Sequence, residues 1–176
     1  MIFTDIAYFI FLIISALIYR QAASLRNWVL IASGIAFYTY YATGFIWLFI
    51  IEAIAIYYLT HSKTKIGLIS AIAIPLILLG YYKYSGFFYS IFSPSNNPFI
   101  SIALPLAISF FTFEFLHYSF DYMRGRVEKK SLTNFLAFIA FFPSMAAGPI
   151  KRFQDFNNQL EQNVKTSLGD WYAGGI

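Results

Sequence analysis

Residues 27–51, NWVLIASGIAFYTYYATGFIWLFII, decide the fold class, because none of these 25 residues is charged. As one α-helix they would be about 37 Å long, against a bilayer hydrocarbon core of about 30 Å. The whole chain agrees with this stretch: 59% of its 176 residues are hydrophobic and 11% are charged, where soluble domains have roughly a quarter charged. This composition excludes a soluble globular enzyme and a disordered chain, and the absence of cysteine excludes a disulfide scaffold.

Four further hydrophobic stretches flank this one, at residues 6–19, 66–82 (continuing to 92), 99–113 (continuing to 120) and 132–150. Asp5 precedes the first stretch without any lysine or arginine, which is the wrong flank for a cleaved signal peptide. Pro143, Gly148 and Pro149 interrupt the last stretch. We therefore expect an all-α integral membrane protein with four to five hydrophobic helical segments, of which the fifth is irregular or re-entrant.

The positive charges help to choose between a straight and a re-entrant fifth segment. Five straight crossings would leave six lysines and arginines on each side of the membrane, which indicates no orientation. A fifth segment that enters and returns on one side would change this count to nine against three. The positive-inside rule thus favours a re-entrant segment and a cytoplasmic basic face.

The composition changes after residue 150, which divides the chain into a transmembrane region at 1–150 and a tail at 151–176. Large apolar residues recur in the tail at intervals of three and four, separated by Gln, Asn, Asp and Glu: Phe153, Phe156, Leu160, Val164, Leu168 and Trp171. This spacing predicts an amphipathic helix that lies in the membrane interface or against the protein. The last residues resemble the entry to a further, truncated membrane segment.

Ionisable residues within hydrophobic segments are candidates for function, because inserting one costs about 2.5–3.5 kcal/mol. Glu52 is interpreted as lying near a headgroup boundary. Glu114, His117, Asp121 and Arg124 are spaced i, i+3, i+7 and i+10, which predicts one polar stripe along a helix. The stripe either lines a path for a polar substrate, with His117 able to move a proton, or forms an ion-pair ladder that orients the helix.

Signatures of soluble enzymes are missing from the sequence. It has no phosphate-binding glycine loop and no Gly-x-Ser-x-Gly elbow. Its two histidines, His61 and His117, lie in separate segments, so no metal site is expected. The net charge of +4 arises from loops beside hydrophobic segments, which indicates membrane topology and no nucleic-acid partner.

Three ordered motifs make the sequence specific: LPLAISFFTFE at 104–114, YSFDYMRG at 118–125 and FFPSMAAGPIKR at 141–152. Together they resemble the membrane-bound O-acyltransferase family, and most closely its bacterial alginate O-acetyltransferase branch. The resemblance extends from about residue 28 to about residue 160. It implies structural roles for the motif residues Pro105, Pro143, Gly148, Pro149 and Arg152.

The resemblance also implies a partial ring of tilted helices around a funnel, in a multi-pass protein of the bacterial inner membrane. The implied activity transfers an acyl group, acetyl in this branch, to a hydroxyl of an extracytoplasmic polysaccharide. The acyl donor would be acetyl-CoA or an acyl carrier, and the partners a glycan acceptor, an acyl-donor protein and the lipid bilayer. No bound cofactor is implied.

One feature of the family has no counterpart in these residues. Its catalytic histidine lies downstream, in the second half of a chain more than twice as long, and His117 occupies a position where relatives carry a small polar residue. We therefore expect no catalytic residue in this chain and no activity without a complementing C-terminal half. The alternative is a non-enzymatic membrane scaffold that binds a partner, and a transporter that uses the polar stripe is a third hypothesis.

Overall fold

The computed structural model describes residues 5–22, 24–92, 103–127, 131–145, 148 and 151–161, and all regular elements within these ranges are helices. The first helix, α1 (Ile6–Gln21), begins where the Asp5 carboxylate accepts a hydrogen bond from the backbone N–H of Ala7 at 3.0 Å. It packs against α2 and leaves an apolar outer face that includes Ile10 and Ile13. Such a face suits contact with lipid.

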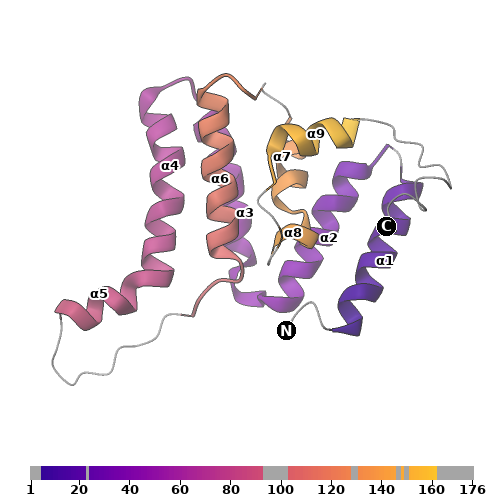
Figure 1. Cartoon of the computed structure of the whole chain (residues 1–176), viewed down its shortest axis with the longest axis horizontal. Coiled ribbons are helices and arrows are strands. Elements are labelled where there is room, and N and C mark those ends of the chain that lie inside the picture. The colour runs from indigo at the N-terminus through magenta and orange to yellow at the C-terminus, as the bar shows by residue number, and fades with distance from the viewer. Residues whose placement is uncertain are drawn as a thin grey trace, which may run out of the picture.

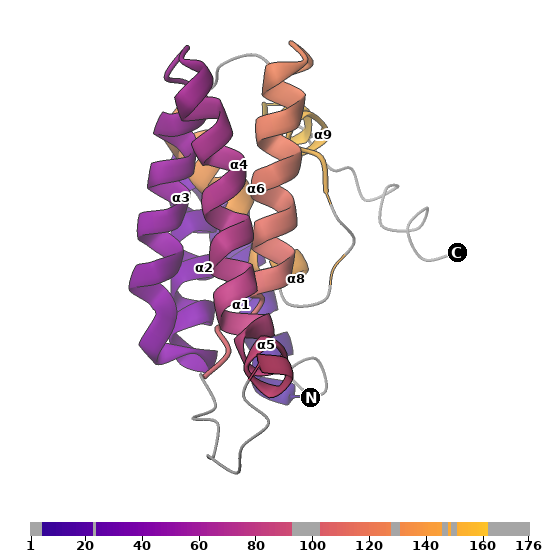
Figure 2. The same ribbon diagram turned by 90° about the vertical axis from the view of Figure 1, so that its left-hand side faces the viewer.

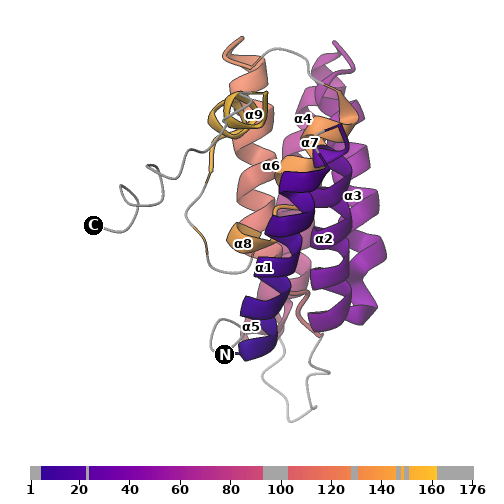
Figure 3. The same cartoon turned by 90° about the vertical axis from the view of Figure 1, so that its right-hand side faces the viewer.

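Residues 27–51 form two helices, so the prediction of one straight segment is wrong. α2 (Arg26–Tyr41) ends at Ala42, the 3₁₀ turn η2 (Thr43–Phe45) follows, and α3 (Ile46–Thr60) runs back beside it (Figures 1 and 3). Ala42 has non-helical dihedral angles (φ −149°, ψ 54°), and the Gly44 that follows is a poor helix former. The reversal lets Tyr38 of α2 stack on Phe49 of α3, with ring centroids 5.2 Å apart.

α4 (Lys65–Leu79) starts from the Thr64 hydroxyl, which accepts from the N–H of Gly67 at 3.0 Å. It continues through a π-helical turn, η3 (Gly80–Tyr84), into α5 (Ser85–Phe92). Figure 1 shows α5 turning away from the axis of α4, as expected where a π turn follows a helix that contains proline. Lys65–Tyr89, 25 residues, is the one described helix that could cross a membrane by length and composition, while Ile6–Gln21 and Ile46–Thr60 are shorter apolar helices.

α6 (Ile108–Met123) packs against both α3 and α4 (Figure 2). It follows the turn at Leu106 and Ala107, where the Tyr38 hydroxyl donates to the Leu106 carbonyl at 3.1 Å. Aromatic rings fill the core between α2, α3, α6 and α7, and the largest fully buried ones are Tyr38, Phe111, Phe115, Tyr118, Phe135 and Phe138.

The fifth hydrophobic stretch contains two short helices, α7 (Leu132–Ile139) and α8 (Phe142–Met145). In Figure 1, α7 descends from the end of the molecule where α6 finishes, and α9 (Phe153–Glu161) lies back at that same end. The Asn134 side chain at the start of α7 donates to the Asn157 side chain of α9 at 2.6 Å. The described residues of 131–161 therefore begin and finish at one end of the helix bundle, and we call them the hairpin.

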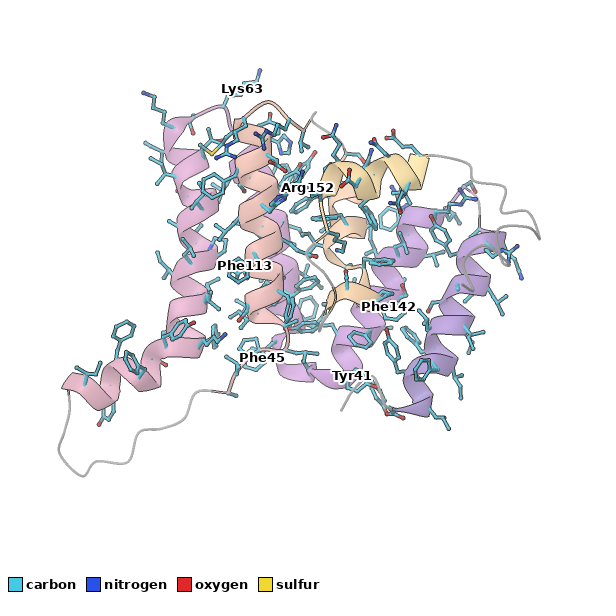
Figure 4. All side chains as sticks on the ribbon, viewed as in Figure 1. Tyr41, Phe45, Lys63, Phe113, Phe142 and Arg152 are labelled. Atoms are coloured by element: carbon cyan, nitrogen blue, oxygen red, sulfur yellow. The ribbon has the colours of Figure 1, made fainter. Side chains whose placement is uncertain are left out.

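The reversal within residues 27–51 also changes which lysines and arginines lie at the same end of the molecule, compared with one straight segment. Because α2 and α3 are antiparallel, the α1–α2 and α3–α4 connections lie at the same end, where Figure 4 places Lys63 and Arg152, whereas Tyr41 and Phe45 lie at the opposite end. Seven described lysines and arginines belong to this basic end: Arg20, Arg26, Lys63, Lys65, Arg124, Arg126 and Arg152. Lys83 lies at the other end.

The amphipathic helix predicted for residues 151–171 is present as α9 over Phe153–Glu161, with Phe153 buried and Gln154 and Asp155 exposed. The rest of that prediction, the truncated segment after it and the turn at 93–98 lie outside the described residues.

Candidate functional site

A buried ion pair joins α6 to the segment that returns from α8. The Lys151 ammonium lies 3.0 Å from a carboxylate oxygen of Glu114, and the two side chains are 14% and 7% exposed. Because a charge that leaves water without a partner is very costly, each of these groups requires the other. The pair connects the middle of α6 to the start of α9 across the hairpin.

Aromatic rings surround the Lys151 ammonium. It lies 4.2 Å from the centre of the Phe138 ring and 5.6 Å from the centres of Phe141 and Phe156, and it donates to the Phe138 carbonyl. Ring faces attract cations, and the Phe138 carbonyl comes from the last turn of α7, the negative end of that helix. One side chain thus holds α6, α7 and α9 together.

The other members of the predicted stripe lie further along α6, toward the basic end. His117 Nδ1 is 3.4 Å from one Asp121 oxygen, and Arg126 Nη1 is 3.8 Å from the other. His117, Asp121, Arg124 and Arg126 line one cavity of about 320 Å³, together with Arg152.

The structure therefore divides the stripe into two environments. Glu114 belongs to the buried pair, whereas His117, Asp121 and Arg124 belong to the basic cavity. Sequence reasoning treated Lys151 as one of the loop charges and missed its part in this site. A signal for that part was its position between Ile150 and Phe153, at the start of an amphipathic helix.

Four of the five motif residues expected to have structural roles lie among the described residues. Pro105 lies in the turn before α6, and Pro143 lies inside the short α8. A Cβ atom on Gly148 would lie 2.4 Å from the Ser144 Cα, so only glycine allows the returning chain to pass this close to α8. Arg152 borders two cavities, and Pro149 lies outside the described residues.

Glu52 does not lie at the boundary position interpreted from the sequence. It is 3% exposed in the interior of α3, and neither carboxylate oxygen has a hydrogen-bond partner among the described residues. The sequence interpretation assumed one helix that began at residue 27. Because the chain reverses at residues 42–45, Glu52 falls in the middle of a new helix instead.

Sequence reasoning also missed a chain of amides at the basic end. Asn27 of α2 donates to the Asn134 side chain of α7 at 3.0 Å, and Asn134 donates in turn to Asn157 of α9. Asn157 donates to Glu161 at 2.9 Å. These residues fasten the start and end of the hairpin to α2. Within the described ranges, no three His, Asp or Glu residues gather as potential metal ligands.

Comparison with known proteins finds relatives among bacterial O-acetylases and O-acetyltransferases. The chain is 32% identical over 191 residues to a probable alginate O-acetylase of Azotobacter vinelandii, covering 98% of this chain and 38% of that protein. A probable alginate O-acetylase of Pseudomonas aeruginosa is also 32% identical, with 98% and 36% covered. A peptidoglycan O-acetyltransferase of Helicobacter pylori is 28% identical over 187 residues, with 82% and 35% covered. No family model and no solved structure matches the chain.

These relatives confirm the resemblance predicted from the three sequence motifs. The chain spans little more than a third of the length of each of them. In the sequence, the matched region extends before Glu114 and beyond Lys151, since it covers nearly all of the chain.

Proposed function

We propose that these residues form part of a bacterial O-acyltransferase of the inner membrane, which transfers an acetyl group to a hydroxyl of an extracytoplasmic polysaccharide. The observation that carries the proposal is the hairpin at 131–161, held by Glu114 and Lys151, in a chain 32% identical to alginate O-acetylases. The substrate class is taken from the names of those relatives.

In this proposal the chain crosses the membrane several times, with its basic end in the cytoplasm and Asp5 outside. Seven described cations at one end against Lys83 at the other support this orientation. The hairpin enters from the cytoplasm and returns there. Backbone outside long helices is tolerated in a bilayer where protein covers it, and most side chains of the described short helices α7 and α8 are buried.

The lengths of the helices support a thin membrane at the site. α1, α2, α3 and α6 contain 15 or 16 residues each, so they are about 24 Å long, less than the hydrocarbon core of about 30 Å. A thinned bilayer would let a cytoplasmic acyl donor and an external glycan meet. Acetyl-CoA or an acyl carrier would be the donor.

The described residues have scaffold roles in this proposal, and the general base comes from residues outside these 176. His117 lies beside Asp121 and among arginines at the basic end, so its role is to balance charge there. The alternative is a non-enzymatic scaffold that binds a partner through the same hairpin.

The test uses bacteria that make alginate but lack their own O-acetylase. The chain is expressed alone, or together with the remaining portion of the Azotobacter relative, and ester-bound acetate is measured after mild alkaline release. We expect acetate only on co-expression, and we expect His117→Ala to retain it. Acetate made by the chain alone and lost in His117→Ala would overturn the proposal. Two pieces that co-purify without producing acetate would favour the scaffold.

A further inference from the structure

Two cavities share Arg152 as a lining residue. One, of about 780 Å³, lies between α1, α2 and the segments around α8 and α9. The other is the basic cavity of about 320 Å³ beside α6. Arg152 lines both, since it stands where the returning chain enters α9 (Figure 4).

The smaller cavity suits a phosphate group. Arg124, Arg126 and Arg152 line it, and Asp121 is the one acidic residue in its described lining. A single carboxylate cannot neutralise three guanidinium groups, so the cavity keeps a net positive charge even with His117 neutral. Guanidinium groups bind phosphate oxygens through paired, charge-assisted hydrogen bonds.

The larger cavity suits a hydrocarbon chain. Its volume is within the range of ligand sites, and apolar side chains from both walls cover most of it: Leu12, Ala16, Leu30, Phe142, Phe156 and Leu160. Lys151 also borders this cavity, but its charge is paired with Glu114. Arg152 and Asp155 are therefore the charged groups at its rim that lie outside that pair.

We propose that this site binds an anionic phospholipid, with its phosphate between Arg124, Arg126 and Arg152 and one acyl chain in the larger cavity. A soluble phosphate compound would leave the apolar cavity empty, and a lipid without net charge would leave the arginines without a counter-charge. The site lies at the basic end, where anionic lipids of a cytoplasmic leaflet gather around lysine and arginine. The inference does not depend on acyl transfer.

The experiment measures binding to the purified chain in neutral detergent, by native mass spectrometry and by thermal unfolding. Phosphatidylglycerol is the probe, and phosphatidylcholine, diacylglycerol and coenzyme A are the comparisons. We expect saturable binding of phosphatidylglycerol with a higher melting temperature. The double variant Arg124→Gln/Arg126→Gln should weaken it roughly 30-fold, because each arginine near a charged lipid surface contributes about fivefold.

Three further variants separate binding at this site from general attraction to charge. Ala16→Trp fills the larger cavity and should weaken phosphatidylglycerol binding, whereas Ile69→Trp, on the exposed face of α4, should not. The control Lys63→Gln/Lys65→Gln removes the same charge from the same end, outside the cavity, and should leave binding unchanged.

Three outcomes would overturn the proposal. Equal binding of phosphatidylcholine and phosphatidylglycerol would exclude a phosphate site that requires net negative charge. Equal loss in the Lys63/Lys65 control would reduce the effect to surface electrostatics. Coenzyme A binding that depends on Arg124 and Arg126 but is unaffected by Ala16→Trp, without phosphatidylglycerol binding, would assign the cavity to a soluble phosphate compound.

Discussion

The pairing of Glu114 with Lys151 makes a quantitative prediction about stability. The closest atoms of the two groups are 3.0 Å apart, which corresponds to a Coulomb attraction of about 5.5 kcal/mol at an effective dielectric constant of about 20. Desolvation of both groups offsets much of this attraction. Removing one partner, however, leaves the other charge buried, so Lys151→Met or Glu114→Gln alone should lower the free energy of unfolding by about 3–5 kcal/mol.

The double variant Glu114→Gln/Lys151→Met should be more stable than either single variant, because no unpaired charge remains. We expect it to lose only about 1–2 kcal/mol, the cost of a buried amide with incomplete hydrogen bonds. The coupling energy from the four proteins should then be about 4 kcal/mol or more.

The assay is equilibrium unfolding in mixed detergent micelles, followed by the fluorescence of the chain's three tryptophans. Lys65→Met is the matched control, since Lys65 is exposed, and it should change the unfolding free energy by less than about 0.5 kcal/mol. Additive effects of the two substitutions, or single losses no larger than that of the control, would refute the reasoning that the pair holds the hairpin.

Three further predictions concern the fold. Because α2 and α3 reverse at residues 42–45, single cysteines at Ser24 and Ser62 should label from one side of the membrane and a cysteine at Gly44 from the other; a straight segment would instead separate Ser24 from Ser62. Gly34→Ala should destabilise the protein by about 1–3 kcal/mol in the same unfolding assay, since its Cβ would lie 1.8 Å from the Ala140 carbonyl oxygen, whereas Gly44→Ala meets no atom within 4 Å and should be tolerated. Asn134→Ala should cost about 2–3 kcal/mol, because it removes hydrogen bonds from Asn27 and to Asn157, and a loss below that of Gly44→Ala would contradict this role.

The helical class and the outer helices could be predicted because hydrophobic periods and caps are local. The side chains of Asp5 and Thr64 cap helices α1 and α4, because their oxygen atoms accept hydrogen bonds from backbone N–H groups of the first turn. The reversal at residues 42–45 could not be predicted from charge, because the turn Ala-Thr-Gly-Phe is as uncharged as the helices on either side of it. What stabilises it is the packing of Tyr38 on Phe49, which depends on tertiary structure.

The dependence on tertiary structure also explains why the candidate site was only partly predicted. Spacing predicted one stripe of Glu114, His117, Asp121 and Arg124, but spacing carries no information about what approaches the helix. Lys151 is 37 residues away from Glu114, and it reaches the carboxylate only because α7 and α8 enter the bundle and the chain returns past Ser144. A glycine at 148 makes that return possible. Lys151 thus reaches Glu114 only because the backbone passes close to Ser144 at Gly148. The periodicity of hydrophobic residues along a helix does not predict such a contact.

The reversal at residues 42–45 and the return at Gly148 have a common electrostatic consequence. With both present, the α1–α2 turn, the α3–α4 turn, the end of α6 and the start of α9 all lie at one end of the bundle. If residues 27–51 were straight, Arg20 and Arg26 would move to the opposite side and the bias would weaken. The positive-inside rule therefore favours the folded arrangement over the straight one, because the reversal brings two more cations to the side that Arg124, Arg126 and Arg152 already occupy.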